Sequence, residues 1–221
     1  VIQSWTGAAA TSRFGFAMTG LGDINSDGFA DVAISSPTLG NGVAQVFSGF
    51  DGTQLQLFSP PSWPPTSLYG FALEDVGDFN QDGIDDLILS AIDDINFGVA
   101  ERVEIRSGGD FSTLLSIDTT FGSPPAFGTA ICGAGDLNGD GITDIAVGHV
   151  ADASLVDGAD SGRVAILFLN ASGYVKEENV IMSDDDDALR LSDSNATLFA
   201  HHGGEEPQNS FGVSLAPIGD Y

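Results

Sequence analysis

Three short stretches of the chain place oxygen-bearing side chains at alternate positions. In each stretch aspartate, asparagine and aspartate occupy positions 1, 3 and 5, a glycine follows, and a further aspartate closes the loop at position 9. Such oxygens can surround a hard cation, and Ca²⁺ accepts about 6–8 of them in flexible geometry, including a backbone carbonyl at position 7. The candidate ligands are Asp23, Asn25, Asp27, Phe29 and Asp31; Asp78, Asn80, Asp82, Ile84 and Asp86; and Asp136, Asn138, Asp140, Ile142 and Asp144. We therefore expect three Ca²⁺ ions, one in each loop.

An aromatic residue followed by glycine precedes every loop at the same distance. These pairs are Phe14-Gly15, Tyr69-Gly70 and Phe127-Gly128, and a fourth pair, Phe211-Gly212, precedes Asp220. Self-similarity at a fixed spacing indicates a repeat protein. The interval between the third and fourth pairs is the longest, which predicts an insertion over residues 182–210. We expect the aromatic residues of the pairs to be buried between neighbouring units.

The EF-hand is the main alternative explanation for these loops. An EF-hand needs an acidic residue at position 12 and helices on both sides. Position 12 is instead apolar, and each loop runs into a β-rich apolar segment; the residues there are Ile34, Leu89 and Val147. The loops are therefore predicted to connect β-strands.

Each unit contains four segments typical of β-strands. Glycine is abundant, with 29 residues, and residues 53–58 alternate polar and apolar side chains as half-buried strands do. The predicted fold class is all-β. The expected strands are 14–21, 31–35, 42–47 and 53–58; 69–76, 86–90, 99–106 and 113–117; and 127–134, 144–148, 162–169 and 174–181.

The composition limits the classes of partner. Only 6 basic residues accompany 32 acidic ones, giving a formal net charge of −26, which disfavours binding to nucleic acid. No long apolar run predicts insertion into a membrane. Cys132 is the sole cysteine, so the chain cannot form an internal disulfide. Asn170 and Asn195 each begin an N-glycosylation acceptor pattern.

The aromatic-glycine start, the aspartate loop and the apolar strand after it together resemble FG-GAP repeats, the units of the integrin α-chain β-propeller. The resemblance covers nearly the whole chain apart from residues 182–210, although the Gly-Ala-Pro part of the motif is degenerate. It implies a propeller with one four-stranded antiparallel blade per repeat. It also implies a structural calcium ion between the first two strands of each blade, with ligands binding on the opposite face.

The repeats predict a single propeller segment over residues 1–221. A propeller closes with about 4–8 blades, so three full blades and the end strands form only part of one. Both ends are expected to contact further protein, either more blades of the same protein or another copy of the chain. The expected parts are a preceding blade's last strand and linker (1–13), blades at 14–68, 69–126 and 127–210, the last with the insertion at 182–210, and the start of a further blade (211–221).

The sequence favours a non-catalytic, calcium-stabilised propeller of an extracellular or surface protein that acts in adhesion, assembly or partner binding. Metal binding and blade structure account for the residues at demanding spacing, and no catalytic set stands apart from the loops. Two alternatives remain open at this point. One is a polysaccharide hydrolase or lyase. The other is a glycan-binding lectin that uses aromatic side chains such as Trp63 and Tyr174 as stacking platforms.

Overall fold

The computed structural model describes residues 3–60, 67–93, 101–118, 127–149, 163–170 and 175–182. The chain divides into two compact units, Val1–Phe121 and Gly122–Tyr221, and each is described here by itself. Several of the sequence-based expectations lie outside the described residues. They concern Trp63, Tyr174, Asn195, the insertion at 182–210 and the further blade start at 211–221.

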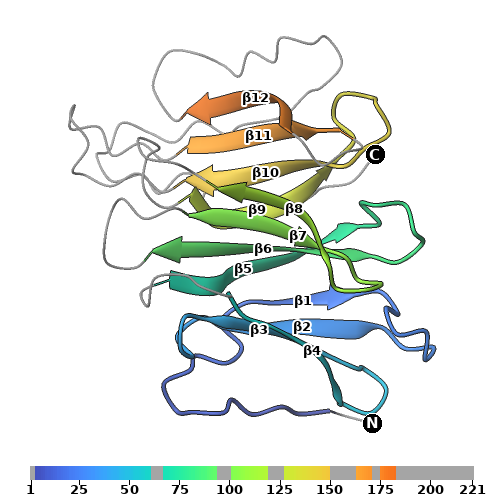
Figure 1. Ribbon diagram of the computed structural model, residues 1–221, viewed down its shortest axis with the longest axis vertical. Coiled ribbons are helices and arrows are strands. Elements are labelled where there is room, and N and C mark those ends of the chain that lie inside the picture. The colour runs from blue at the N-terminus through green and yellow to red at the C-terminus, as the bar shows by residue number, and fades with distance from the viewer. Residues whose placement is uncertain are drawn as a thin grey trace. The chain divides into compact units, whose positions relative to one another are not determined.

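The first unit contains two four-stranded antiparallel sheets in which consecutive strands are neighbours (Figure 1). This simple up-and-down order is that of a propeller blade. The first sheet is formed by β1 (Met18–Leu21), β2 (Asp31–Ser36), β3 (Val43–Phe47) and β4 (Gln54–Phe58). The second is formed by β5 (Ser67–Gly77), β6 (Asp86–Asp93), β7 (Arg102–Arg106) and β8 (Thr113–Asp118).

The second unit contains one sheet of the same kind, again with four antiparallel strands in sequence order (Figure 1). Its strands are β9 (Phe127–Gly135), β10 (Asp144–His149), β11 (Arg163–Leu169) and β12 (Val175–Met182). In all three sheets the predicted cation loop connects the first strand to the second. The predicted all-β fold with four-stranded antiparallel blades is confirmed.

The first strand of the first blade is shorter than predicted. Residues 14–17 form turns instead, because Arg13 and Gly15 adopt φ angles of 51° and 84°, in the left-handed region. This segment still bonds to the end of β2, where the amide of Ala17 donates to the Ser35 hydroxyl at 3.0 Å. The second blade repeats this bond between Ala72 and Ser90, at 3.1 Å, inside a break in the β5–β6 register.

Glycine is required after the aromatic residue of the second blade. Gly70 has a φ of 79°, which L-residues with side chains rarely adopt. A Cβ atom there would also lie 3.1 Å from the carbonyl oxygen of Val43 on β3. The glycine thereby allows β5 of the second blade to approach the backbone of β3 in the first blade closely.

Each unit has its own hydrophobic core. In the first unit the core lies between the two blades and joins Leu21, Ala33, Val46 and Phe58 to Tyr69, Leu73, Leu87 and Leu89. In the second unit Cys132, Ala146, Val164, Ile166 and Phe168 pack together. The expected burial of a motif aromatic between neighbouring blades is confirmed for Tyr69, which is 1% exposed; Phe127 is also buried, at 4% exposed.

Phe14 differs from these two aromatics because it is only half-buried. The described part of its surroundings supplies Phe47 as a ring neighbour, whereas Tyr69 is enclosed by two blades. The expectation for Phe211 lies outside the described residues.

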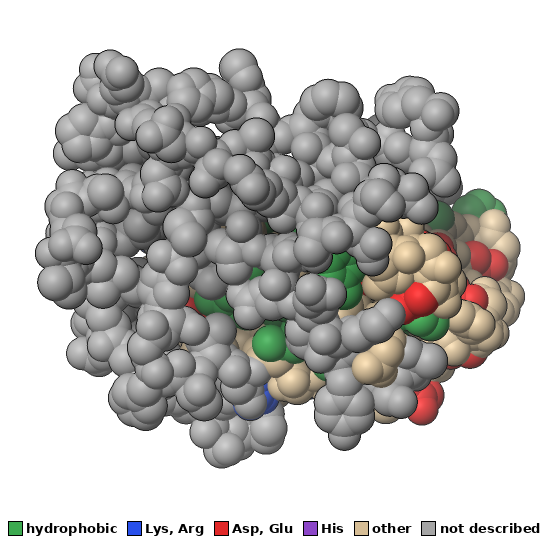
Figure 2. Space-filling model, turned by 90° about the horizontal axis from the view of Figure 1, so that it is seen from above, with side chains coloured by type: hydrophobic (Ala, Val, Ile, Leu, Met, Phe, Trp, Pro, Cys, Tyr) green, Lys and Arg blue, Asp and Glu red, His purple; other side chains and the backbone are tan. Residues whose placement is uncertain are grey.

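The described surface is rich in acidic side chains. In Figure 2 red acidic groups recur over the described part of the face shown, and blue basic groups are scarce. Phe29 and Phe50 are 50% and 56% exposed and pack against each other. Within the described residues, no helix is long and apolar enough to cross a membrane.

Candidate metal-binding loops

The first loop gathers its first three polar side chains around shared backbone amides. The amide of Asp27 donates to Oδ1 of Asp23 and to Oδ1 of Asn25, each at 2.9 Å. The amide of Gly28 donates to the other Asp23 oxygen at 2.8 Å. Two side-chain oxygens that share one N–H donor must converge on one side of the loop. Asn25 also donates from Nδ2 to Oδ2 of Asp27 at 2.8 Å, so the side chains at positions 1, 3 and 5 form one cluster.

The second loop repeats this arrangement. The amide of Asp82 donates to Oδ1 of Asp78 at 2.8 Å and to Oδ1 of Asn80 at 2.9 Å. Nδ2 of Asn80 donates to Oδ2 of Asp82 at 2.8 Å, as its counterpart does in the first loop. The pattern is therefore a property of the repeated sequence and not of one loop.

The third loop shares the central bonds and differs at its asparagine. The amide of Asp140 donates to Oδ1 of Asp136 at 3.0 Å and to Oδ1 of Asn138 at 2.9 Å. Nδ2 of Asn138, unlike the other two asparagine nitrogens, is buried with no hydrogen-bond partner among the described residues. The oxygens at positions 1 and 3 nevertheless converge as they do in the other loops.

In every loop the backbone amide at position 7 donates to the carboxylate of the aspartate at position 5. The amides of Phe29, Ile84 and Ile142 donate to the aspartate two residues earlier at 3.0, 2.9 and 3.0 Å. Phe29 is exposed, whereas Ile84 and Ile142 are half-buried. These bonds place the position-7 backbone beside the side-chain cluster.

The aspartate at position 9 is bonded to a different set of groups. Asp31, Asp86 and Asp144 are 2%, 0% and 0% exposed, and both oxygens of each accept backbone amides. Oδ2 accepts from the start of the loop, and Oδ1 accepts from the last residue of the third strand or from the second residue after it. The donors are Ile24 and Gly49; Phe79, Asn80 and Gly108; and Leu137 and Leu169. This carboxylate therefore fastens the loop to the C-terminal end of the blade's third strand.

Burial raises the pKa of the carboxyl at position 9 in all three loops, since loss of water penalises the charged form. The backbone amides lower the pKa and partly offset this effect. Repulsion from a neighbouring loop aspartate raises it further, and that neighbour is Asp27 for Asp31, Asp82 for Asp86, and Asp140 with Asp136 for Asp144. The loops thus hold like charges at short range, which a divalent cation would relieve.

The residues present fit an oxygen-liganded cation in their chemistry and at positions 1, 3 and 5. The described residues contain no group of three His, Cys, Asp or Glu side chains placed to hold a metal ion. This is consistent with the geometry, because each cluster has two aspartates and one asparagine, and the third aspartate is turned to backbone donors. A carboxylate offers about four lone-pair positions, so position 9 keeps capacity for a cation after accepting two amides, or three in the case of Asp86.

Sequence reasoning did not identify the role of the serines in the turns after β3 and β7. The hydroxyl of Ser48, just after β3, donates to Oδ2 of Asp27 at 2.9 Å and accepts the amide of Phe50 at 3.1 Å. Ser107 occupies the same place in the second blade and accepts the amide of Gly109. The recurring Ser-Gly pairs at Ser48 and Ser107 were the available signal.

Comparison with known proteins finds the model of the FG-GAP repeat over residues 14–47 and 127–167. These segments contain the first and third loops with the strands around them. Integrin alpha-2 from Mus musculus is 32% identical over 167 residues, covering 67% of this chain and 14% of the integrin. Integrin alpha-2 from Bos taurus is 31% identical over 205 residues, covering 80% of this chain and 17% of the integrin.

The chain belongs to the integrin-alpha-like FG-GAP repeat family. The second blade lies outside the two matched segments, yet it has the same loop hydrogen bonds and the same strand order. The structure therefore identifies three FG-GAP blades among the described residues. The chain spans less than a fifth of the length of these integrin relatives.

Proposed function

We propose that this FG-GAP protein is a calcium-stabilised, non-catalytic propeller segment of an extracellular or surface protein that acts in adhesion, assembly or partner binding. The observation that carries the proposal is the threefold repetition of one oxygen cluster at positions 1, 3 and 5. Its oxygen donors suit Ca²⁺, and the repulsion between aspartates in each loop explains why a cation would stabilise the fold. Positions 7 and 9 complete the proposed ligand set in each loop.

When bound, the ion supplies charge neutralisation and coordination, and the chain supplies the arrangement of oxygens. Asp23, Asn25 and Asp27 of the first loop would hold it, with their counterparts doing so in the other loops. The carboxylate of Asp31 already fastens the loop to the turn after β3. Calcium binding would therefore strengthen a connection between the first three strands of a blade and leave the opposite ends of the strands free for a partner.

We also propose that further protein lies beyond both ends of the segment, with the boundaries 1–13, 14–68, 69–126, 127–210 and 211–221. Trp5 supports this at the start of the chain, because its indole nitrogen donates to the carbonyl of Gly52 at 3.0 Å and its ring lies 5.4 Å from that of Phe47. Such contacts suit the last strand of a preceding blade. Light scattering in calcium tests this point: an unassociated, stable monomer of these residues would contradict it.

Adhesion requires an experiment of its own, because calcium binding alone would not show it. Beads coated with the chain are allowed to settle on a surface carrying extracellular-matrix protein, with calcium or with chelator present. The proposal predicts retention that depends on calcium and is lost when Asp27, Asp82 and Asp140 are all replaced by alanine. Equal retention of coated and uncoated beads would contradict an adhesive role.

A further inference from the structure

Phe58, Tyr69 and Arg106 form one contact set where the two blades of the first unit meet. Cζ of Arg106 on β7 lies 5.5 Å from the centre of the Phe58 ring on β4. Nη2 of the same guanidinium lies 3.4 Å from the hydroxyl of Tyr69 on β5. Phe58 is 6% exposed and Tyr69 is 1% exposed. The second blade therefore meets the last strand of the first blade with a half-buried guanidinium group, the Arg106 side chain being 17% exposed.

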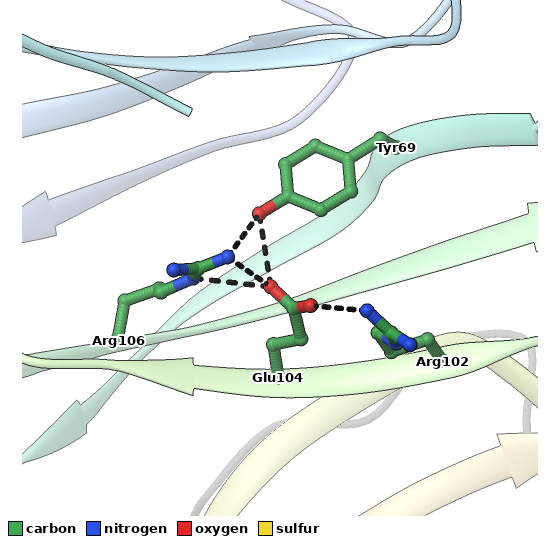
Figure 3. Close-up of polar contacts among 4 residues, drawn as sticks. All are labelled: Tyr69, Arg102, Glu104 and Arg106. Carbon is green, nitrogen blue, oxygen red and sulfur yellow. Dashed lines mark hydrogen bonds and ion pairs between the residues drawn. The ribbon is translucent and has the colours of Figure 1, made fainter. Parts of the chain in front are cut away.

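Glu104 holds this guanidinium in place (Figure 3). Its Oε2 atom accepts from Nε and Nη2 of Arg106 at 3.0 and 2.7 Å and from the Tyr69 hydroxyl at 3.0 Å. Its Oε1 atom accepts from Nη1 of Arg102 at 3.0 Å. The Glu104 side chain is only 4% exposed. Burial and the Glu104 charge raise the pKa of Tyr69 strongly, so its hydroxyl stays protonated and remains a donor.

The first blade has the same backbone frame at the equivalent positions. After β3, the amide of Gly52 donates to the carbonyl of Ser48 at 2.9 Å, and after β7 the amide of Phe111 donates to that of Ser107 at 3.0 Å. This turn aligns Phe47 with Arg106 and Gly52 with Phe111. The aromatic-glycine pairs align Phe14 with Tyr69.

The residues at these aligned positions make corresponding contacts. Phe47 lies 5.4 Å from Trp5 and 6.1 Å, edge to face, from Phe14. Trp5 also bonds to Gly52, just as Phe58 meets Phe111 at 5.9 Å. Trp5 therefore contacts the same two positions of the first blade that Phe58 contacts in the second. The two sets are Trp5, Phe14 and Phe47, and Phe58, Tyr69 and Arg106.

The side chains at the aligned positions differ between blades, although the backbone hydrogen bonds around them are the same. In the third blade Leu169 donates to Asp144 as Gly108 donates to Asp86, which aligns Leu167 with Arg106 and Ala165 with Glu104. Phe127, Ala165 and Leu167 are all buried and apolar. The first blade has Gln45 at the Glu104 position. Glutamate thus occurs only where tyrosine and arginine also occur, which indicates that the three polar residues belong together.

We propose that these sets are specificity-determining contacts that select which strand packs against each blade. The second blade selects a strand with an aromatic residue, here Phe58, because a guanidinium fixed by Glu104 is attracted to the face of an aromatic ring. An aliphatic residue would cover the same charged groups without that attraction. The first blade uses aromatic packing to accept the indole of Trp5. This inference does not depend on whether the loops bind calcium.

The polar set can be exchanged for the apolar residues that the third blade provides. Arg106→Leu alone leaves Glu104 with one guanidinium fewer, and Glu104→Ala alone leaves two arginines without their common acceptor. Removing one member of a buried ion pair is strongly destabilising, whereas an apolar replacement of the whole group is often neutral. Tyr69→Phe/Glu104→Ala/Arg106→Leu copies the third blade and is therefore the matched background.

The test compares Phe58→Leu in the wild-type chain and in this matched background. Hydrogen exchange of the β4 and β7 amides reports opening of the junction. We expect the loss of protection on Phe58→Leu to be about two to five times greater in the wild type, which is the size of a partly exposed cation–π contact. Leu55→Val, in the same core but outside the set, should give equal losses in both backgrounds.

Equal effects of Phe58→Leu in both backgrounds would overturn the proposal, because Phe58 would then be a generic apolar contact. If the matched background does not fold, Arg106→Lys takes its place. Lysine keeps the positive charge beside Glu104 and lacks the planar group that stacks on the ring. The proposal then predicts a smaller loss on Phe58→Leu in Arg106→Lys than in the wild type, and an unchanged loss contradicts it.

Discussion

Removing the carboxylate of Asp86 should destabilise the protein even when no metal can bind. Asp86 is fully buried and accepts the amides of Phe79, Asn80 and Gly108 at 2.9, 3.1 and 2.9 Å. Asp86→Ala leaves the amides of Asn80 and Gly108 without this acceptor, whereas the amide of Phe79 keeps its second bond, to the Gly77 carbonyl at 2.9 Å. The loop would then be detached from the turn after β7, which is a structural loss independent of any calcium ligand.

The magnitude follows from the number of donors. Each buried polar group left without a partner costs about 1–3 kcal/mol. The two that lose their acceptor, Asn80 and Gly108, give a loss of about 2–6 kcal/mol in the free energy of unfolding, and water entering the vacated space would place the result toward the lower end. Removal of the buried charge offsets part of the loss, because burial raises the pKa of Asp86 and so disfavours its ionised form at neutral pH. We expect a net loss of about 2 kcal/mol or more.

Urea unfolding in excess chelator measures this structural term. Asp82→Ala is the matched control, because Asp82 is exposed and belongs to the proposed ligand cluster of the same loop. With chelator, Asp86→Ala should lower the unfolding midpoint much more than Asp82→Ala, whereas in calcium both should lower it. If Asp86→Ala caused no loss in chelator, the carboxylate would act only as a metal ligand, and the role assigned to it here would be wrong.

Further predictions concern charge, packing and metal content. Burial raises the pKa of Glu74, so the ionised side chain weakens the fold. The folded protein is therefore more stable with Glu74 protonated: this stability is fully present below the ordinary pKa of 4.5 and is lost as the pH rises through the folded-state pKa. Glu74→Gln should therefore raise the urea midpoint at neutral pH and leave it unchanged in acid; an unchanged midpoint at neutral pH would contradict this. Phe127→Ala should cost about 3–5 kcal/mol in the same assay, and a loss below about 1 kcal/mol would argue against close packing of this ring. Asp27→Ala and Asp140→Ala should each remove one calcium ion per chain by elemental analysis, while retention of all bound calcium would exclude these residues as ligands.

The fold was predictable because its signals are local and repeated. Alternating strands, the aspartate loops and the aromatic-glycine pairs gave the strand order of each blade and the position of every loop. The structure shortened one strand, at residues 14–17, because the φ angles of Arg13 and Gly15 replace a regular start by turns. That detail depends on individual backbone conformations, which the alternation of polar and apolar residues does not encode.

The candidate loops were predictable in their membership and only partly in their arrangement. The spacing correctly indicated that the side chains at positions 1, 3 and 5, such as Asp23, Asn25 and Asp27, come together. The hydrogen bonds of Asp31 were not predictable, because one of its donors, Gly49, lies in the turn that follows β3, 18 residues later in the sequence. The contact of Glu104 with Tyr69 likewise depends on strand pairing, because β6 pairs with both β5 and β7 and so brings the two residues within hydrogen-bond distance. Both depend on contacts between segments distant in sequence.

Calcium titration by isothermal calorimetry, with the bound ions counted by native mass spectrometry, tests the central claim most directly. Three complete loops predict three Ca²⁺ ions per chain and a melting temperature that falls when chelator removes them, because a ligand that binds only the folded state stabilises it. Mg²⁺ should substitute poorly, since it requires near-octahedral geometry and releases water reluctantly. A chain that binds no calcium and melts at the same temperature in calcium and in chelator would contradict the account.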